Sequence, residues 1–184
     1  MLGTLVARAA TAVTRTEPPR LFVELGRHPR LFRSWLPFAG TLLFRADLPR
    51  PDTELVILRT AVNCRCDYEW VQHVKLAERA GLSEDEIVAA ARVDASTCLT
   101  WRQQRLLDAT DELHEVRRIS TTTFGRLEHA LSSRQLMELC MLVGHYEMLA
   151  MTINSLAIQP EPTAIAHLSA RTAAIAEELT PSFA

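Results

Sequence analysis

The 184-residue sequence lacks several features that would assign it to a specialised class of protein. It has no run of 18 apolar residues, so we expect no membrane-spanning helix and no membrane partner. Its net charge of −2 and its pI of about 6.3 give no electrostatic footprint for nucleic acid. Its four cysteines do not make a disulfide framework at this length, so a reduced, cytoplasmic chain is expected.

Strand signals are also missing, because no segment combines β-branched alternation with hairpin turns, and no short internal repeat is present. The apolar fraction of 48% and the charged fraction of 23% are ordinary for a globular protein, and the length suits one domain. Proline clusters at 18–19, 49–51 and 160–162 divide the chain into helical stretches. The sequence therefore predicts an all-α fold.

Helix boundary signals recur along the chain. The helix that follows Pro29 should be kinked or interrupted at Pro37. Asp67 is expected to cap a helix that stops at Gly81, and Ser83 with the Glu three residues later forms a capping-box pattern. Further helices are expected to begin near residues 51, 101, 120 and 133, the last running to about residue 156.

We divide the chain into an N-terminal arm at 1–29, a domain at 30–162 and a C-terminal helix at 163–184. The first fifteen residues resemble a signal peptide only superficially, since Arg8 interrupts the apolar stretch and no basic segment precedes it. A frayed or amphipathic arm is the better interpretation of this segment.

Four potentially reactive side chains gather in residues 54–73, ELVILRTAVNCRCDYEWVQH. Cys66, Glu69 and His73 have the i, i+3 and i+7 spacing that places side chains along one face of a helix. Glu54 lies twelve residues before Cys66, far enough to belong to a preceding helix folded against this one. A carboxylate, a thiol and an imidazole between two helices would suit acid/base or redox chemistry.

This stretch resembles the carboxymuconolactone decarboxylase and AhpD-type alkylhydroperoxidase superfamily, whose signature is a Glu followed by Cys-x-x-Cys-x-x-x-His. Glu54, Cys66 and His73 match the signature, whereas Glu69 stands at the position of the second Cys. The letters YEW before His73 are similar to the decarboxylase-like branch, and the likeness covers roughly 30–161. The resemblance implies an AhpD-like helical bundle and a homo-oligomer (dimer, trimer or hexamer), with sites near subunit interfaces.

The residues of the motif also have plainer interpretations. Glu54 could be a first-turn Glu favoured by the helix macrodipole, but the resemblance favours an inward-facing acid/base group. Glu69 and His73 could be an exposed i,i+4 pair, worth only about 0.2–0.5 kcal/mol. Against this, Trp70 neighbours the pair, and the family places this His in its active site. His73 is therefore the first candidate for a functional residue.

The remaining candidates carry open alternatives. Cys66 is either a nucleophile or a small residue at a tight helix start, and Glu69 opposes its ionisation. Tyr68 is either a hydrogen-bond donor to substrate or an interface tyrosine. Arg59, with Trp70, is a weak candidate for orienting substrate, and Arg59 could equally be a structural ion-pair residue.

Outside the motif, three residues are given structural interpretations. Cys140 is expected to be a small buried core residue, and His145 a satisfied core or interface histidine. His114, between two Glu residues in sequence, is expected on a solvated surface. The helix from about residue 133 to 156 is apolar on more than one face, so we expect it to contribute to a subunit interface.

We expect cofactor-independent acid/base catalysis on a small carbonyl, carboxylate or lactone compound, by decarboxylation, isomerisation or elimination. One alternative is a thiol-dependent peroxidase that uses Cys66, and another is a non-catalytic helical oligomer that binds small ligands. No metal site is expected, since the possible ligands Glu54, Cys66, Glu69 and His73 follow no recognised metal-binding spacing.

Overall fold

The computed structural model describes residues 19–92 and 98–180, and within these ranges the regular structure is helical, with no strand. The all-α prediction is therefore confirmed. The helices, in chain order, are α2 (Arg20–Leu25), α3 (Pro29–Phe44), α4 (Arg50–Asn63), α5 (Asp67–Arg79), α6 (Glu84–Ala91), α7 (Trp101–Val116), α8 (Thr121–Leu127), α9 (Ser133–Ser155), α10 (Pro162–Ile165) and α11 (Ala170–Leu179).

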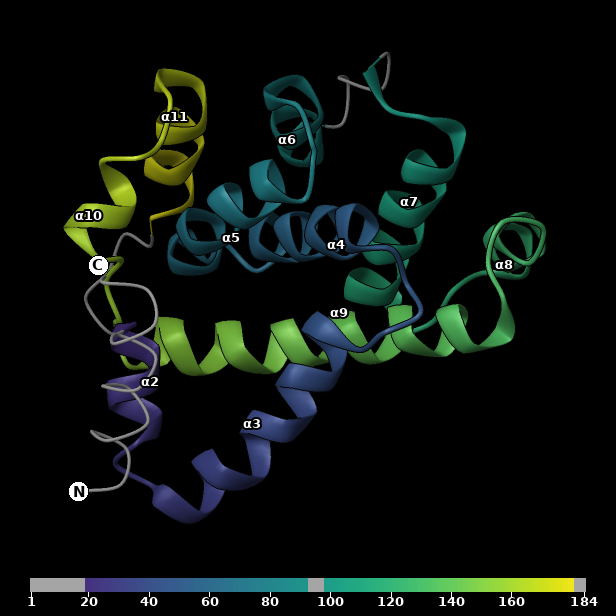
Figure 1. The fold of residues 1–184 in the computed structure, drawn as a ribbon. Helices are drawn as coiled ribbons and strands as arrows, with labels where there is room; N and C mark the ends of the chain where they lie inside the picture. Colours follow the sequence, from purple (N-terminus) through teal and green to yellow (C-terminus); the bar gives the residue numbers. More distant parts are fainter. Residues whose placement is uncertain (1–18, 93–97, 181–184) are drawn as a thin grey trace.

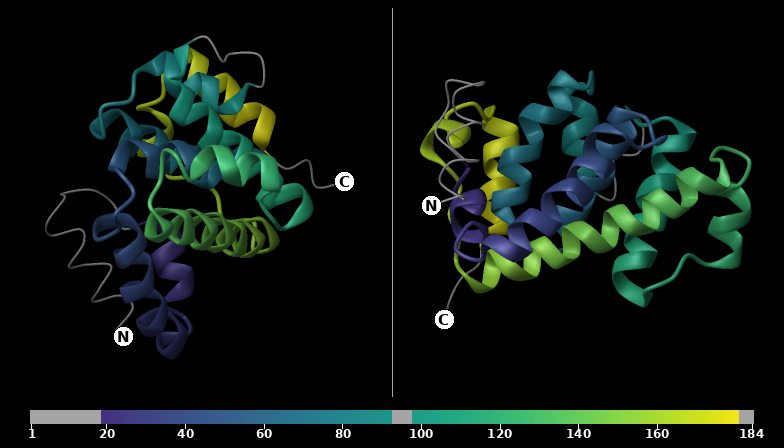
Figure 2. Two further views of the ribbon diagram at one scale, coloured as in Figure 1. Left: turned by 90° about the vertical axis from the view of Figure 1, so that its right-hand side faces the viewer. Right: turned by 60° about the horizontal axis from the view of Figure 1, so that its bottom comes forward.

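Helix α4 is the centre of the molecule and contacts α5, α6, α7 and α9 (Figure 1). All its side chains from Asp52 to Ala61 are buried, so it has no solvent-facing stripe over that length. The long helix α9 runs beside this group, and α2 and α3 lie on the far side of α9 (Figure 2). A polar residue on α4 therefore has to find its partners inside the protein.

Side-chain caps explain where several helices begin. The predicted capping box at the start of α6 is confirmed: Ser83 Oγ accepts from the Glu86 backbone N–H, and the Glu86 carboxylate accepts from the Ser83 N–H at 2.8 Å. Thr100 and Ser132 form the same reciprocal arrangement at the starts of α7 and α9. Each box satisfies two backbone donors that a helix end would otherwise leave unpaired.

Of the two outcomes expected at Pro37, a kink or an interruption, the structure excludes the interruption, since α3 continues to Phe44 with the proline inside it. One boundary prediction requires correction. The N-cap of α5 is Cys66 rather than Asp67, because Cys66 has extended backbone angles and Asp67 already belongs to the helix. The Asp67 carboxylate still accepts a first-turn hydrogen bond from the Tyr68 N–H at 2.8 Å.

Most of the predicted N-terminal arm, residues 1–18, lies outside the described residues. Its last part contains α2, whose Leu21 is buried against the core and whose Leu21 N–H donates to the Tyr68 hydroxyl. At the other end, α11 lies against α5 and α6. Both ends of the described chain are thus attached to the α5 side of the bundle.

Helix α9 divides into a buried face and an exposed face. Its buried side chains include Leu139, Leu142 and Ile153, whereas four methionines of the other face are exposed: Met137, Met141, Met148 and Met151. Among the described helices, only α9 is long and apolar enough to cross a bilayer. In its most apolar stretch, 56% of the residues are buried within the fold. This burial is typical of the core helix of a globular protein.

Candidate active site

A tight connection between α4 and α5 brings the Glu and the His of the motif together. Arg65 adopts a left-handed backbone conformation with φ of 50°, and the Cys66 N–H donates back to the Ala61 carbonyl at 2.8 Å. The chain therefore reverses within a few residues, and α5 runs back along α4. Glu54 Oε2 and His73 Nδ1 are 2.7 Å apart, so the preceding helix does fold against the helix that carries His73, as expected.

Glu54 has a second partner on its own helix. Its side chain is fully buried, and its Oε1 forms an ion pair with Arg50 one turn earlier. The guanidinium of Arg50 lies 5.3 Å from the centroid of the Phe44 ring, and its side chain is 29% exposed. The Glu54 carboxylate is thus held between an arginine that reaches solvent and a buried imidazole. The i,i+4 spacing of Arg50 and Glu54 is the signal in the sequence that could have indicated this pair.

Glu69, which replaces the second Cys of the family motif, is also buried. Neither oxygen of its carboxyl has a hydrogen-bond partner among the described residues. Burial raises the pKa of Glu69 well above its usual value, and the Cys66 thiol, a turn earlier, offsets only part of this effect. Burial therefore favours the protonated form of the Glu69 carboxyl.

The same surroundings suppress ionisation of the Cys66 thiol. Cys66 is fully buried, and both burial and the proximity of Glu69 raise the pKa of its thiol. A thiol near a helix N-terminus would otherwise be favoured as a thiolate. Here the cost of burying the charge is the larger effect, so Cys66 lacks the property that makes a cysteine nucleophilic.

Helix α9 contributes two residues that the sequence did not place in this site. The Tyr146 ring lies edge-on to the His73 ring, with 5.1 Å between centroids, and edge-on to His145 at 5.3 Å. Burial raises the pKa of Tyr146 well above its usual value, and the negative charges of Glu54 and Glu69 add to this effect. Tyr146 therefore remains a neutral phenol beside the Glu54–His73 pair.

His145 is buried as predicted but is not satisfied. Its Nδ1 has no hydrogen-bond partner among the described residues, and its ring is stacked on Trp35 at 6.0 Å between centroids. Burial lowers the pKa of His145 to about 4, with a smaller contribution from His73. Trp35 Nε1 is likewise buried without a partner in the described chain.

Three residues proposed from sequence are not brought to this cluster. The Arg59 guanidinium donates two hydrogen bonds to Asp111 on α7, at 2.6 and 2.7 Å, and a third to the Ala90 carbonyl. Asn63 also donates to Asp111, at 2.8 Å. The structure thus favours the alternative interpretation of Arg59, a structural ion pair that joins α4 to α7.

Tyr68 and Trp70 also make structural contacts. The Tyr68 hydroxyl donates to Glu161 at 3.2 Å while accepting from the N-terminal helix α2. Trp70 is fully buried, and its indole N–H donates to the Thr172 carbonyl of α11 at 3.0 Å. Both side chains attach α5 to the ends of the described chain.

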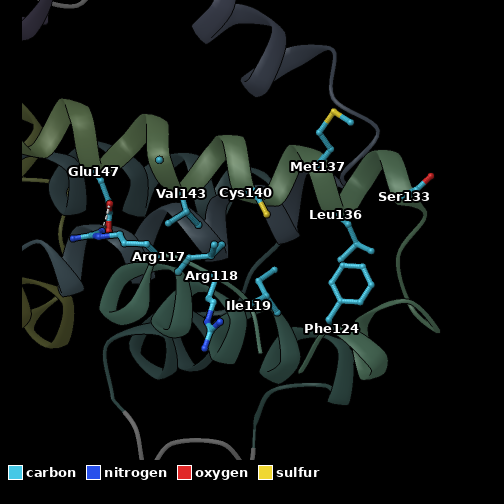
Figure 3. A pocket seen from close by; sticks show the side chains of 12 residues that line it. Arg117, Arg118, Ile119, Phe124, Ser133, Leu136, Met137, Cys140, Val143 and Glu147 are labelled. Carbon is cyan, nitrogen blue, oxygen red and sulfur yellow. Dashed lines mark hydrogen bonds and ion pairs between the residues drawn. The ribbon is translucent and has the colours of Figure 1, made fainter. Parts of the chain in front are cut away.

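A wide groove lies away from this cluster (Figure 3). It has a volume of about 630 Å³ and is formed by the exposed side of α9 together with α8 and the end of α7. Cys140 lies in this groove and is exposed, which corrects the prediction of a buried core cysteine. The Cys140 side chain lies on the solvent-facing side of α9. Its small size and its apolar neighbours in the sequence therefore did not indicate burial.

Comparison with known proteins gives the fold of this arrangement and a family match over part of the chain. A family model described as the carboxymuconolactone decarboxylase family matches residues 29–112, which include the α4–α5 hairpin. No curated protein is significantly similar to the chain.

The solved structures that are similar in fold include the following three. An uncharacterized peroxidase-related protein from Ralstonia eutropha JMP134, described as an alkylhydroperoxidase AhpD core, has a TM-score of 0.79 at 15% identity, over 88% of this chain and 86% of that one. An uncharacterized peroxidase-related protein from Silicibacter sp. TM1040 gives 0.78 at 13% identity, over 88% and 85%. A protein of unknown function from Agrobacterium tumefaciens gives 0.65 at 20% identity, over 72% and 92%.

Proposed function

We propose that the chain is a member of the carboxymuconolactone decarboxylase and AhpD-like superfamily and that it catalyses cofactor-independent proton transfer on a small molecule. The family match over residues 29–112 and the AhpD-like fold support this proposal. The substrate would carry a carbonyl or lactone group together with a carboxylate. The observation that carries the proposal is the fully buried Glu54 carboxylate, hydrogen-bonded to His73 at 2.7 Å. Decarboxylation, isomerisation and elimination each begin or end with such a proton transfer.

In this proposal His73 is the group that takes and returns the proton. With Nδ1–H donated to Glu54, the lone pair of the imidazole is on Nε2, which no described side chain contacts by a hydrogen bond. Arg50 forms an ion pair with the other carboxylate oxygen of Glu54. Glu54 therefore fixes the tautomer and orientation of His73 and stabilises the imidazolium that forms when His73 takes a proton.

Two further groups would bind the substrate. Arg50 is the cation that reaches from the cluster to solvent, where it lines a small pocket with Leu43, Phe44 and Leu48. We assign it, rather than Arg59, to the substrate carboxylate. His145 has a pKa of about 4, so it is a neutral imidazole at neutral pH and offers an N–H to the substrate carbonyl.

Acid/base chemistry is favoured over thiol peroxidase chemistry by the state of the cysteines. Cys66 is buried with a raised thiol pKa, and Glu69 occupies the position of a resolving Cys. Cys64, the other nearby thiol, has a pKa raised to about 12. Neither thiol is readily converted to the thiolate that reacts with a peroxide.

Solvent exchange gives a test that does not require the natural substrate to be known. We would incubate the protein in D2O with a panel of 2-oxo acids, 3-oxo acids and unsaturated lactones and follow deuterium incorporation next to the carbonyl by NMR. We expect exchange with the wild type on at least one class, and a loss of about 10²–10⁴-fold in His73→Gln and Glu54→Gln. Arg50→Gln should raise KM more than it lowers kcat.

His129→Gln provides the matched control, because His129 is an exposed histidine after α8 and makes no contact with the cluster. It should exchange substrate protons at the wild-type rate. If ligands of the panel bind but no exchange depends on His73 or Glu54, the non-catalytic ligand-binding alternative replaces our proposal.

A further inference from the structure

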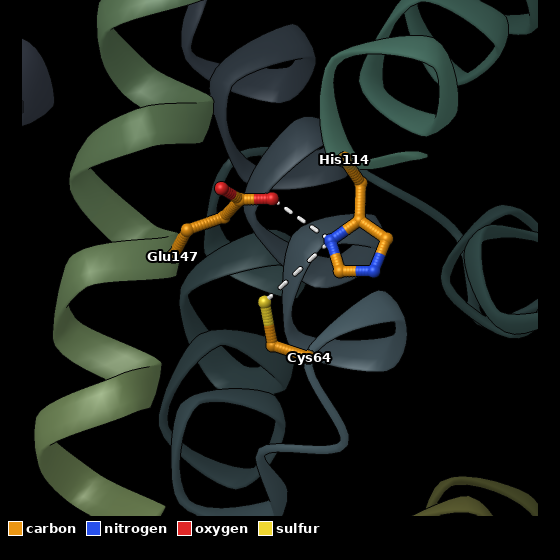
Figure 4. Close-up of side chains that lie close together, drawn as sticks. All are labelled: Cys64, His114 and Glu147. Atoms are coloured by element: carbon orange, nitrogen blue, oxygen red, sulfur yellow. Dashed lines mark hydrogen bonds and ion pairs between the residues drawn. The ribbon is translucent and has the colours of Figure 1, made fainter. Parts of the chain in front are cut away.

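A second cluster of ligand-type side chains lies outside the proposed active site (Figure 4). Cys64 ends α4, His114 is in the last turn of α7, and Glu147 is on α9. His114 Nδ1 is 2.8 Å from Glu147 Oε1 and 4.0 Å from Cys64 Sγ, and the three ligand atoms all lie within 4.8 Å of one another. His114 is half-buried here, which corrects the prediction of a solvated surface position.

Neighbouring residues fix the positions of Cys64 and Glu147. The Cys64 carbonyl accepts a hydrogen bond from Asn154 Nδ2 at 3.0 Å, which ties the end of α4 to α9. Arg117 Nη1 is 2.5 Å from Glu147 Oε2, so the arginine orients the carboxylate and leaves Oε1 facing His114 and Cys64. Neighbours that orient a ligand in this way are a usual feature of metal sites.

The geometry does not fit a nucleophilic cysteine. A Cys–His–Glu triad uses both ring nitrogens, one toward the thiol and the other toward the carboxylate. Here the same nitrogen, His114 Nδ1, faces both Cys64 and Glu147, while Nε2 points away from them (Figure 4). An Nδ1–H that donates to Glu147 has no lone pair with which to accept the thiol proton.

The Cys64 thiol has too little positive charge near it to favour its ionised form. Burial raises the pKa of the Cys64 thiol to about 12, and the nearby Glu69 and Glu147 carboxylates contribute to this rise. Arg117 lowers it, but by less. A divalent cation among the three donors would neutralise both the thiolate and the Glu147 carboxylate.

We propose that Cys64, His114 and Glu147 form a binding site for a divalent transition-metal ion, with zinc as the best match. Thiolate sulfur, imidazole nitrogen and carboxylate oxygen are the three kinds of ligand that zinc takes from proteins. Tetrahedral coordination places such donors about 3.3–3.6 Å apart. The observed separations of 2.8 and 4.0 Å differ from these values by about half an ångström, and the Cys64 and Glu147 ligand atoms lie within 4.8 Å of each other, so side-chain adjustment would complete the site.

Binding is balanced in protons and charge. The Cys64 thiol loses one proton to solvent, and the imidazole proton moves from Nδ1 to the outward-facing Nε2. Thiolate and carboxylate together neutralise the dication, and water takes the fourth position. Glu147 and Arg117 also line one end of the α9 groove, which gives the ion and its water a path from solvent (Figure 3).

Cobalt(II) provides the first test, since a cobalt–thiolate bond produces a charge-transfer absorption in the near ultraviolet. We would titrate the reduced, metal-free protein with cobalt chloride and then with zinc chloride. We expect one cobalt ion per chain with this absorption, and its loss when zinc is added. Zinc alone should raise the Tm of the wild type, because it binds the folded state.

Cys64→Ser should abolish the absorption and the zinc-dependent rise in Tm, and His114→Gln should abolish the rise. Cys140→Ser should change neither, because Cys140 is an exposed cysteine on the same groove but outside the cluster. Circular dichroism of each metal-free variant checks that it folds. No absorption in the wild type, or an absorption that survives Cys64→Ser, would overturn the proposal.

Alkylation of the unmodified protein gives a second measurement that does not depend on any variant. With iodoacetamide and mass spectrometry, zinc should slow the modification of Cys64 and leave that of Cys140 unchanged. Equal modification of Cys64 with and without zinc would also refute the site.

Discussion

Replacement of His145 by phenylalanine tests how strongly the buried site penalises a positive charge. The pKa of His145 is lowered from its usual 6.5 to about 4 by burial, so the unfolded chain binds a proton at a higher pH than the folded one does. A depressed pKa contributes stability that is present above about pH 6.5 and is lost as the pH falls toward about 4. Between about pH 7.5 and about pH 5 this loss amounts to about 2 kcal/mol.

His145→Phe removes this dependence while keeping an aromatic ring against Trp35 and Phe38. The raised pKa of Glu69 has the opposite effect, because it lowers the free energy of unfolding as the pH rises. This contribution is the same in the wild type and in the variant, so it cancels in the comparison. The assay is urea unfolding at a series of pH values. On going from about pH 7.5 to about pH 5, the wild type should lose about 2 kcal/mol more than the variant does. Parallel pH profiles for the two proteins would refute the reasoning.

Other consequences can be measured separately. With a dithiol reductant the wild type should consume hydroperoxides weakly or not at all, and robust turnover that disappears in Cys66→Ser would restore the peroxidase interpretation. Arg59→Ala should lower the free energy of unfolding by about 3 kcal/mol in a urea titration, because it leaves Asp111 without its buried partner. We also propose a homo-oligomer through the methionine stripe of α9, so light scattering should give a mass above 20.6 kDa and Met148→Glu with Met151→Glu should reduce it to that of one chain.

The parts of the site that were predicted from sequence are those set by local geometry. Glu54 and His73 meet because a short connection folds α5 back on α4, and helical spacing alone puts Glu69 on the face of His73. For the same geometric reason, Tyr68 and Trp70 do not join the cluster. Each is one residue from Glu69, which rotates its side chain by about 100° around α5, toward the chain ends instead of the cluster.

The residues that sequence analysis missed come from tertiary contacts. His145 and Tyr146 are far from the motif in sequence, and only the docking of α9 against the hairpin brings them to His73. The same is true of the Cys64, His114 and Glu147 cluster, whose members belong to three different helices. No spacing rule within one helix relates such residues, so their proximity follows only from the folded structure.

The protonation state of His73 tests the central claim most directly. In nitrogen-15 NMR of protein labelled at histidine, the account predicts that the neutral form of His73 carries its proton on Nδ1, donated to Glu54, and has an unprotonated Nε2. Glu54→Gln should remove the strongly hydrogen-bonded Nδ1 proton signal, and His129→Gln should leave it in place. A His73 that carries its proton on Nε2, or whose spectrum is unchanged in Glu54→Gln, would contradict the proposed role of this pair.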